Sequence, residues 1–281
     1  MAVNLAILEV RDVVKRFGSA HRSDARPALD GVSLTVDGST RLGIVGESGS
    51  GKSTLARIMV GLEAPTSGTV DFRGNDVHRM APAARRRFRK EVQLIAQDTS
   101  SSFDPSRTLR DSVRRPAELL LGVDRPEADE LVDEALALVG IAPELVDRKP
   151  PDVSGGQRQR IAIARGLIVK PSLIICDEVV SALDVSIQGT VLNFLKRYCD
   201  SADAGLIFVS HGLPATAFVA RDIVVMRHGE IVEHGPTNDV LLDGQHPYTR
   251  SLVEAYAGSA PPPGAPVGVA VDDRPVAWQG A

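Results

Sequence analysis

The feature that most constrains this chain is one glycine-rich octapeptide near its beginning. Residues 46–53 read Gly-Glu-Ser-Gly-Ser-Gly-Lys-Ser, which matches the spacing G-x-x-x-x-G-K-[ST]. A short apolar run, Arg41–Val45, precedes the octapeptide, and a helical pattern over residues 55–62 follows it. Because such loops join a strand to a helix, the segment predicts an α/β fold.

The chemistry of this loop indicates phosphate binding. Its glycines let successive backbone N–H groups curl around phosphate oxygens at the positive end of a helix. We expect Lys52 to reach the β and γ oxygens, and the Ser53 hydroxyl to ligate Mg²⁺. A flexible loop without function is the alternative, but a chance match arises in roughly one chain in a hundred of this size. The predicted site comprises Gly46, Glu47, Ser48, Gly49, Ser50, Gly51, Lys52, Ser53 and Thr54.

Two adjacent carboxylates follow a second apolar run. Asp177 and Glu178 come directly after residues 173–176, at the end of a predicted buried strand. Open α/β sheets bind ligands at that end of their strands. We expect Asp177 to hold Mg²⁺ through water, and Glu178 to orient or deprotonate an attacking water. Alone, such a pair would equally fit a surface turn.

The remaining pattern predicts a layered α/β domain. Apolar runs at 206–209 and 223–226 are typical of parallel strands covered on both faces. Alternation near residues 8–10 and 32–36 predicts two half-buried strands. Helical patterns cover 156–169 and 187–198, and residues 98–152 indicate a helical insertion. From residue 258 the chain is rich in Pro, Ala and Gly, so we expect a disordered tail.

Composition excludes several classes of protein. The hydrophobic fraction of 43% is sufficient for a packed core, and the net charge of −4, with both signs interspersed, predicts no nucleic-acid surface. The basic run at 85–90 is therefore interpreted as a solvated helix face. No apolar run approaches the roughly 20 residues of a membrane-spanning helix, and the N-terminus lacks a signal pattern. The two cysteines predict reduced thiols.

A third motif resembles the signature of the ATP-binding-cassette superfamily. Residues 153–157 read Val-Ser-Gly-Gly-Gln, and Arg-Gln-Arg-Ile-Ala-Ile-Ala-Arg follows. The resemblance implies a P-loop NTPase (RecA-like) core with a mostly parallel sheet, an N-terminal antiparallel β subdomain and an α-helical insertion. It also implies head-to-tail pairing of two subunits. Each ATP would then lie between the phosphate loop of one subunit and Ser154, Gly155, Gly156 and Gln157 of the other.

The resemblance assigns further residues by position. Gln97 matches the Q-loop glutamine that approaches Mg²⁺, so the implied metal ligands are Ser53, Gln97 and Asp177. Asp184 matches the D-loop aspartate, and His211 the switch histidine that contacts the γ-phosphate. Phe17 stands where the family stacks an aromatic ring on adenine, with plain core packing as the alternative. The implied catalytic set is Lys52, Gln97, Glu178 and His211, acting on ATP with Mg²⁺.

The resemblance covers residues 5–257, with a helical subdomain at about 98–170. Gln-His-Pro-Tyr-Thr-Arg at 245–250 is similar to ATPases of oligopeptide, dipeptide and nickel importers, although a turn before a final helix also explains it. The implied partners are a second cassette ATPase (a related paralogue or a second copy), two transmembrane permeases docking near 98–125 and an external solute-binding protein. The implied location is peripheral, at the cytoplasmic face of the cell membrane. The ATPase of a soluble complex such as carbon–phosphorus lyase is the rival hypothesis.

The sequence departs from the family pattern at several positions. Val153 replaces the usual Leu, Val179 the usual Pro, and Ala96 and Thr99 the usual Phe and Pro beside Gln97. None of these supplies a phosphate or metal contact in the family. Gly212 replaces a common Asp after His211, and because glycine loosens a loop we expect slower turnover. The tail lacks the cysteine cluster of some relatives, so we expect no iron–sulfur centre.

Overall fold

The computed structural model describes residues 6–18, 26–97, 102–181, 183 and 185–257. The predictions for Asp184 and for a disordered tail at 258–281 lie outside these residues. Among the described residues, no helix is both long enough and apolar enough to cross a membrane.

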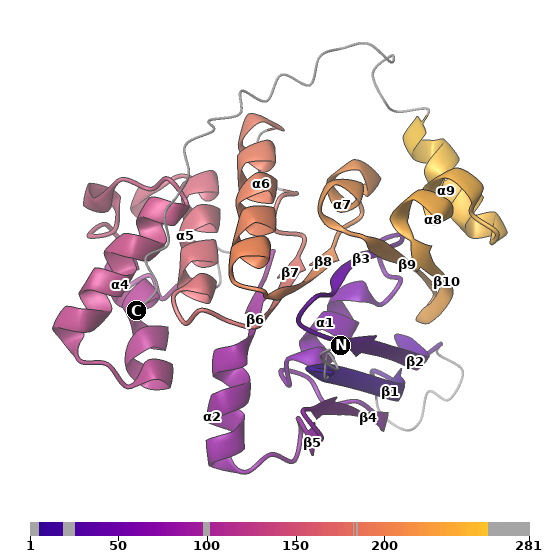
Figure 1. Cartoon of the computed structure of the whole chain (residues 1–281), viewed down its shortest axis with the longest axis horizontal. Coiled ribbons are helices and arrows are strands. Elements are labelled where there is room, and N and C mark those ends of the chain that lie inside the picture. Colours follow the sequence, from indigo (N-terminus) through magenta and orange to yellow (C-terminus); the bar gives the residue numbers. More distant parts are fainter. Residues whose placement is uncertain (1–5, 19–25, 98–101, 182, 184, 258–281) are drawn as a thin grey trace.

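The larger sheet has six strands in the order β10-β9-β3-β8-β7-β6 (Figure 1). Their bounds are β3 Arg41–Val45, β6 Val92–Ile95, β7 Leu173–Asp177, β8 Gly205–Val209, β9 Asp222–Arg227 and β10 Glu230–Pro236. All neighbouring strands are parallel except β10, which pairs with β9 in the antiparallel sense. Every residue of β3, β7 and β8 is buried, which explains their continuous apolar runs. The predicted parallel core is confirmed.

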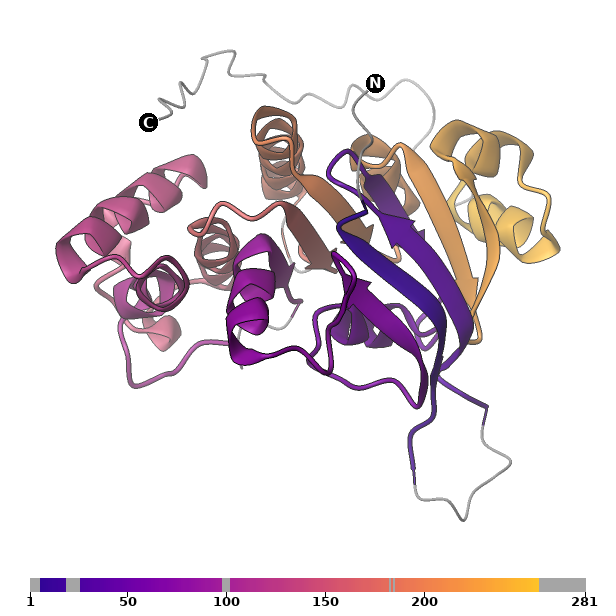
Figure 2. The same cartoon turned by 60° about the horizontal axis from the view of Figure 1, so that its bottom comes forward.

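A smaller antiparallel sheet covers one side of the domain (Figure 2). Its order is β2-β1-β4-β5, with β1 Leu8–Lys15, β2 Leu29–Val36, β4 Ser67–Phe72 and β5 Asn75–Asp76. Helix α1 (Lys52–Met59) shares one buried core with this sheet and with the larger one. The sequence predicted β1 and β2, whereas β4 and β5 were missed because they bury few apolar side chains.

The helical insertion is confirmed. Helices α3 (Leu109–Pro116), α4 (Arg125–Leu138) and α5 (Gly155–Leu167) contact one another beside β6 (Figure 1). A single π turn, Ala117–Leu121, and two short 3₁₀ turns, Pro143–Leu145 and Pro150–Asp152, join them. The buried Arg114 guanidinium forms ion pairs with Asp111, Glu118 and Asp129, so polar contacts as well as the apolar core hold α3 to α4.

The remaining helices flank the larger sheet. They are α2 (Pro82–Glu91), α6 (Val185–Ser201), α7 (Leu213–Val219), α8 (Thr237–Asp243) and α9 (Pro247–Ala257). In α2 only Phe88 is buried, so the basic run is a solvated face as predicted. Helix α9 is the predicted final helix. Cys176 and Cys199 are buried free thiols, and burial raises the pKa of Cys199 to about 11.

Candidate active site

The predicted loops meet at one edge of the larger sheet. The glycine-rich loop follows β3, Asp177 ends β7, and His211 comes two residues after β8. These three strands are adjacent and parallel, with Ile44 and Asp177 both opposite Val209 in register. Because parallel strands end at a common edge, segments more than 120 residues apart in sequence come together.

The glycine-rich loop has a backbone that requires glycine. Gly46, Gly49 and Gly51 have φ angles of 149°, 82° and 104°, which side chains disfavour. A Cβ at Gly46 would lie 2.1 Å from the Met226 carbonyl oxygen, and one at Gly51 would lie 2.4 Å from the Ala28 carbonyl oxygen. At Gly49 a Cβ would meet nothing within 4 Å. Neighbouring backbone thus packs closely against the loop at Gly46 and Gly51, whereas the space beside Gly49 is open. A loop that binds phosphate needs such an open side.

Lys52 is 5% exposed and curls back over its own loop. Its Nζ donates to the carbonyl oxygens of Gly46 at 2.7 Å and Glu47 at 2.8 Å, and lies 3.3 Å from Ser50 Oγ. Burial lowers the pKa of Lys52, and the negative charges of Glu178, Asp177 and Glu47 oppose that shift. The lysine therefore places a partly desolvated cation inside the cradle.

Ser53 and Asp177 join the loop to the end of β7. The Ser53 hydroxyl donates to Asp177 Oδ1 at 2.9 Å, and Asp177 is 5% exposed. Burial raises the pKa of Asp177, with the Ser53 hydrogen bond opposing the shift and the Glu178 charge adding to it. A hydroxyl and a carboxylate are hard oxygen donors of the kind Mg²⁺ takes, usually together with water and substrate phosphates. The oxygen donors of Ser53 and Asp177 therefore fit Mg²⁺.

Glu178 adopts an unusual backbone conformation. Its φ is +51°, in the left-handed region that non-glycine residues seldom occupy, while its N–H donates to the Val209 carbonyl at 2.9 Å. Glu178 Oε1 lies 3.4 Å from His211 Nδ1. Such strain persists only where the surroundings enforce it, and here it places the carboxylate beside the histidine.

Gln97 is linked to Glu178 through Ser181. Its Nε2 is 3.4 Å from Ser181 Oγ, and the Ser181 hydroxyl donates to the Glu178 carbonyl at 2.8 Å. The structure therefore brings Gln97, Glu178 and His211 together around one exposed edge, next to the Ser53–Asp177 pair.

The predicted signature segment caps α5 instead of joining this cluster. The Ser154 hydroxyl accepts the Gln157 N–H at 3.2 Å, and the Gln157 side chain accepts the Ser154 N–H at 2.9 Å. Ser154 and Gly155 are exposed, while a Cβ on Gly156 would meet the Leu183 side chain at 3.5 Å. Figures 1 and 2 place α5 well away from α1. The capping box satisfies the N–H groups of Ser154 and Gln157 within the segment itself.

Phe17 is 58% exposed, with Lys15 Nζ 5.0 Å from its ring centroid. The alternative that Phe17 packs in the core is wrong, because β1 ends two residues earlier and the chain leaves the sheet. The exposed ring remains free to stack on a base. Thr54 is half-buried in the first turn of α1.

In the loop after His211, both backbone polar groups of Gly212 are hydrogen-bonded. The Gly212 N–H donates to Ser210 Oγ at 2.9 Å, and its carbonyl accepts the Thr216 hydroxyl at 2.9 Å. The φ of Gly212 is −88°, which any residue adopts. Val179 is buried in the apolar core, so its side chain serves packing.

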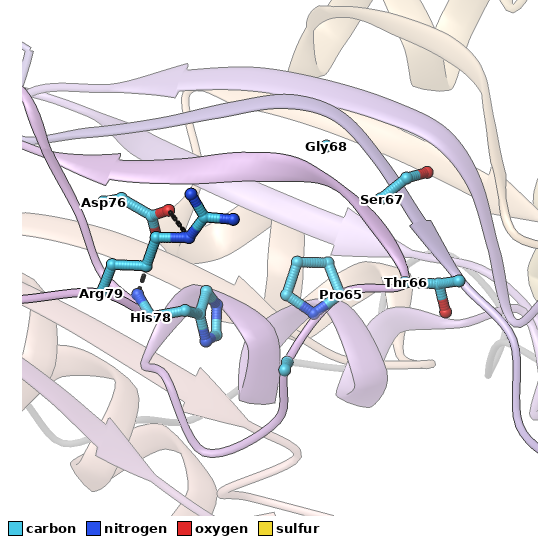
Figure 3. A pocket seen from close by; sticks show the side chains of 8 residues that line it. Pro65, Thr66, Ser67, Gly68, Asp76, His78 and Arg79 are labelled. Atoms are coloured by element: carbon cyan, nitrogen blue, oxygen red, sulfur yellow. Dashed lines mark hydrogen bonds and ion pairs between the residues drawn. The ribbon is translucent and has the colours of Figure 1, made fainter.

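A separate pocket of about 460 Å³ lies in the antiparallel part of the domain (Figure 3). Residues 64–68 line one side, and Asp76, His78 and Arg79 line the other. Asp76 accepts the His78 N–H at 2.8 Å and pairs with Arg79 at 3.5 Å, so its carboxylate is occupied within the pocket wall. None of the predicted site residues lines this pocket.

The sequence analysis missed two tyrosines that contact the site from α9. Tyr248 Oη accepts the Glu47 N–H at 2.9 Å, and Tyr256 Oη donates to the His211 carbonyl oxygen. The motif at 245–250 that contains Tyr248 indicates the family but does not indicate a contact between Tyr248 and the glycine-rich loop. No local pattern connects residue 256 with residue 211.

Taken together, the sheet, the glycine-rich cradle and the acidic strand end define a P-loop nucleotide-binding protein. A family model described as ABC transporter matches residues 29–181. The chain belongs to this family.

Several relatives are similar over most of the chain. The oligopeptide transport ATP-binding protein OppF of Lactococcus lactis is 40% identical over 81% of this chain and 72% of its own length. The di/tripeptide transport ATP-binding protein DppF of Pseudomonas aeruginosa is 39% identical over 85% and 74%. AppF of Bacillus subtilis, an oligopeptide transport ATP-binding protein, is 40% identical over 89% and 78%.

The fold is also similar to solved cassettes. The dimeric ATP-binding cassette MJ0796, bound to ADP and Pi in a post-hydrolysis state, has a TM-score of 0.75 and 24% identity, covering 82% of this chain and 98% of its own. The antiparallel sheet, the mixed sheet and the helical insertion therefore form the cassette fold.

Proposed function

We propose that this chain is the ATP-binding and ATP-hydrolysing subunit of an importer for peptides or related small solutes. The observation that carries the proposal is the cluster at the end of β7. There Ser53 meets Asp177 at 2.9 Å, and Glu178 lies 3.4 Å from His211, beside an open glycine cradle. The relatives at about 40% identity are named as peptide transport proteins, which favours transport over a soluble complex.

The cradle binds and orients the triphosphate. The N–H groups of the loop and the Lys52 ammonium hold the β and γ oxygens, and the exposed Phe17 ring stacks on adenine. Ser53 and Asp177, joined by Gln97, would hold Mg²⁺, which would neutralise phosphate charge when bound. ATP thus meets a preformed backbone cradle, and mainly the side-chain partners of Lys52 and Ser53 have to change.

Hydrolysis then needs one positioned water. Glu178 orients the water and takes up its proton as the water oxygen bonds to the γ-phosphorus, while the bond from that phosphorus to the β–γ bridging oxygen breaks. His211 contacts the γ-phosphate and fixes the Glu178 carboxylate through their 3.4 Å contact. ADP and inorganic phosphate are the products. The protein contributes positioning and charge stabilisation.

A second cassette completes each site. We infer that residues 5–257 form one cassette domain with a helical subdomain at about 98–170. Because α5 lies away from α1, Ser154–Gln157 reach a γ-phosphate only across a dimer, with Asp184 at the same interface. The partner is a related paralogue or a second copy of this chain.

The face presented to the permeases lies beside Gln97. A cleft of about 200 Å³ is bounded by β6, Pro116 and α5, and Ser102 and the Arg165 guanidinium line it. Arg165 donates to the Ser102 carbonyl at 2.6 Å and lies over the Phe103 ring at 4.4 Å, so it fixes the chain leaving the Q-loop. Residues 98–125 are thus proposed to dock two transmembrane permeases that receive solute from an external binding protein. The proposed docking implies a peripheral location at the cytoplasmic face of the membrane.

The catalytic proposal is tested with the purified full chain. Phosphate release is measured with ATP and Mg²⁺, alongside nucleotide binding by a fluorescent ATP analogue. Glu178→Gln removes the base and keeps the size of the side chain, so we expect at least a hundredfold slower hydrolysis with binding unchanged. Equal hydrolysis by both proteins would contradict the role of Glu178.

The transport proposal is tested by affinity purification of the tagged chain from detergent-solubilised cells. Mass spectrometry should recover two multi-span permeases and a second cassette ATPase. Recovery of soluble proteins alone would refute transport and favour a complex of the carbon–phosphorus lyase type.

A further inference from the structure

Two of the three tyrosines of the chain hold loops of the nucleotide site, and both lie on α9. Tyr248 Oη accepts the N–H of Glu47, the second residue of the glycine-rich loop, at 2.9 Å. Tyr256 Oη donates to the backbone carbonyl oxygen of His211. One helix from the C-terminal region therefore contacts the backbone on both sides of the site.

The Gln-His-Pro-Tyr segment fixes where α9 begins. The Glu233 carboxylate on β10 accepts the N–H of Gln245 at 2.7 Å and of His246 at 3.1 Å. His246 Nδ1 accepts the Tyr248 N–H at 3.1 Å, and Pro247 begins the helix without needing a donor partner. These contacts set the position of Tyr248 from the edge of the larger sheet.

Packing restricts both phenol rings. Tyr248 is 6% exposed, and the Arg227 guanidinium lies 4.8 Å from its ring centroid. Its apolar cluster includes Val45, directly before the glycine-rich loop, and Leu213, two residues after His211. Tyr256 packs against the same cluster. The cluster therefore packs α9 against the residues that flank the glycine-rich loop and the loop of His211.

Tyr256 also lies within the electrostatic influence of the catalytic edge. Burial raises the pKa of its phenol, and the negative charge of Glu178 raises it further. The hydroxyl remains protonated near neutral pH and so remains a donor to the His211 carbonyl.

We propose that Tyr248 and Tyr256 are positioning residues for ATP hydrolysis, Tyr248 for the phosphate loop and Tyr256 for the switch histidine. The inference rests on the proposed ATPase function and adds a role for α9 in it. Tyr248 fixes the peptide that begins the phosphate cradle, so its hydroxyl acts on nucleotide binding. Tyr256 fixes the backbone of His211, and the imidazole of His211 faces the Glu178 carboxylate. The Tyr256 hydroxyl therefore acts on turnover.

The two roles predict changes in different kinetic constants: KM for Tyr248 and kcat for Tyr256. Tyr248→Phe keeps the ring and its packing and leaves the Glu47 N–H without its acceptor. Losing one such hydrogen bond should raise the KM and the nucleotide Kd about 2- to 10-fold, with kcat changed by less than about twofold. Tyr256→Phe should lower kcat about 2- to 10-fold with KM nearly unchanged.

The third tyrosine supplies a matched control. Tyr198 is 3% exposed on α6, and its Oη lies 3.5 Å from the Pro171 carbonyl, before β7 begins and so at the opposite end of that strand from Asp177. Tyr198→Phe removes the same atom and should leave KM and kcat unchanged. The full chain and the three variants are compared by steady-state hydrolysis, by binding of a fluorescent ATP analogue and by thermal unfolding.

The outcomes separate this inference from the ATPase proposal. The expected split, with unfolding temperatures close to that of Tyr198→Phe, supports it. Kinetics of both variants equal to the control, or a fall in stability without a split, would overturn it. If the unmodified chain, both by itself and together with its partner cassette, binds nucleotide and does not hydrolyse it, the ATPase proposal and the Tyr256 role both fail, while the Kd of Tyr248→Phe still decides the Tyr248 role.

Discussion

Replacing Gly212 by Asp should stabilise the loop that carries His211. Gly212 has φ −88° and ψ 107°, which any residue adopts, so glycine is not required there. A Cβ at this position would meet only Ser210 Oγ at 3.5 Å, an ordinary contact. Gly212 is also the N-cap of α7, and α7 has no side-chain cap. An aspartate would supply that missing acceptor.

Three effects set the size of the gain. Removing a glycine restricts the unfolded chain by about 0.4–1 kcal/mol. An Asp N-cap stabilises a helix by a few tenths of a kcal/mol more than a Gly N-cap does, and the negative charge of Asp at the helix N-terminus adds about 0.3–1 kcal/mol of stability. The nearby Glu178 carboxylate opposes part of the charge contribution. We expect a net gain of about 1 kcal/mol, or a rise of roughly 2–4 °C in Tm for a domain of this size. A more restricted loop should also raise kcat, because glycine loosens the loop that carries His211.

Thermal unfolding by circular dichroism, without nucleotide, measures the stability, and phosphate release measures kcat. Gly212→Ala is the matched control, because it restricts the backbone equally and offers no acceptor. Tm should increase from the parent to Ala and again to Asp. Equal Tm values for Ala and Asp would refute the capping argument, and a lower Tm for both would refute the conformational one. A kcat no higher than that of the parent would contradict the expectation that Gly212 slows turnover.

Three further changes test other parts of the structure. Phe17→Ala should weaken ATP binding about 2- to 10-fold and leave Tm unchanged, because the ring is 58% exposed; a fall in Tm would favour a packing role. Ser154→Ala removes the cap of α5 and should lower the free energy of unfolding by about 1 kcal/mol, measured in urea, with hydrolysis falling and ATP binding to the isolated chain unchanged. Arg114→Met leaves three carboxylates without their shared cation and should cost roughly 2 kcal/mol in the same assay, between the values for exposed and buried pairs; an unchanged midpoint would show that apolar packing alone holds α3 to α4.

The parts of the fold that the sequence predicted are those whose burial is complete. Strands β3, β7 and β8 are buried at every position, so their composition alone distinguishes them from loops. Strand β4 buries only two apolar side chains, Val70 and Phe72, and β10 half-buries its apolar residues, so neither has the continuous apolar run of β3, β7 and β8. Their position comes from backbone pairing with β1 and β9, which composition does not record.

The same distinction applies to the site. The glycine-rich loop was predictable because its function depends on backbone geometry that a few adjacent glycines encode. The contact of Tyr248 with Glu47 spans 201 residues of sequence and depends on where α9 packs. Phe17 illustrates the reverse problem, because an isolated aromatic residue fits either a core or a binding surface; its exposure excludes the core, and adenine stacking stays a prediction.

The internal contacts of Lys52 and Ser53 imply that nucleotide binding is an exchange of partners. Lys52 already donates to two carbonyl oxygens, and Ser53 to Asp177, so a ligand must replace these bonds before it gains from either residue. Phosphate oxygens carry charge and accept hydrogen bonds roughly twice as strong as those of neutral carbonyls, which makes the exchange of the lysine partners favourable. An uncharged nucleoside has no phosphate oxygens with which to replace these bonds. The arrangement therefore favours a nucleotide that carries phosphate groups over one that carries none.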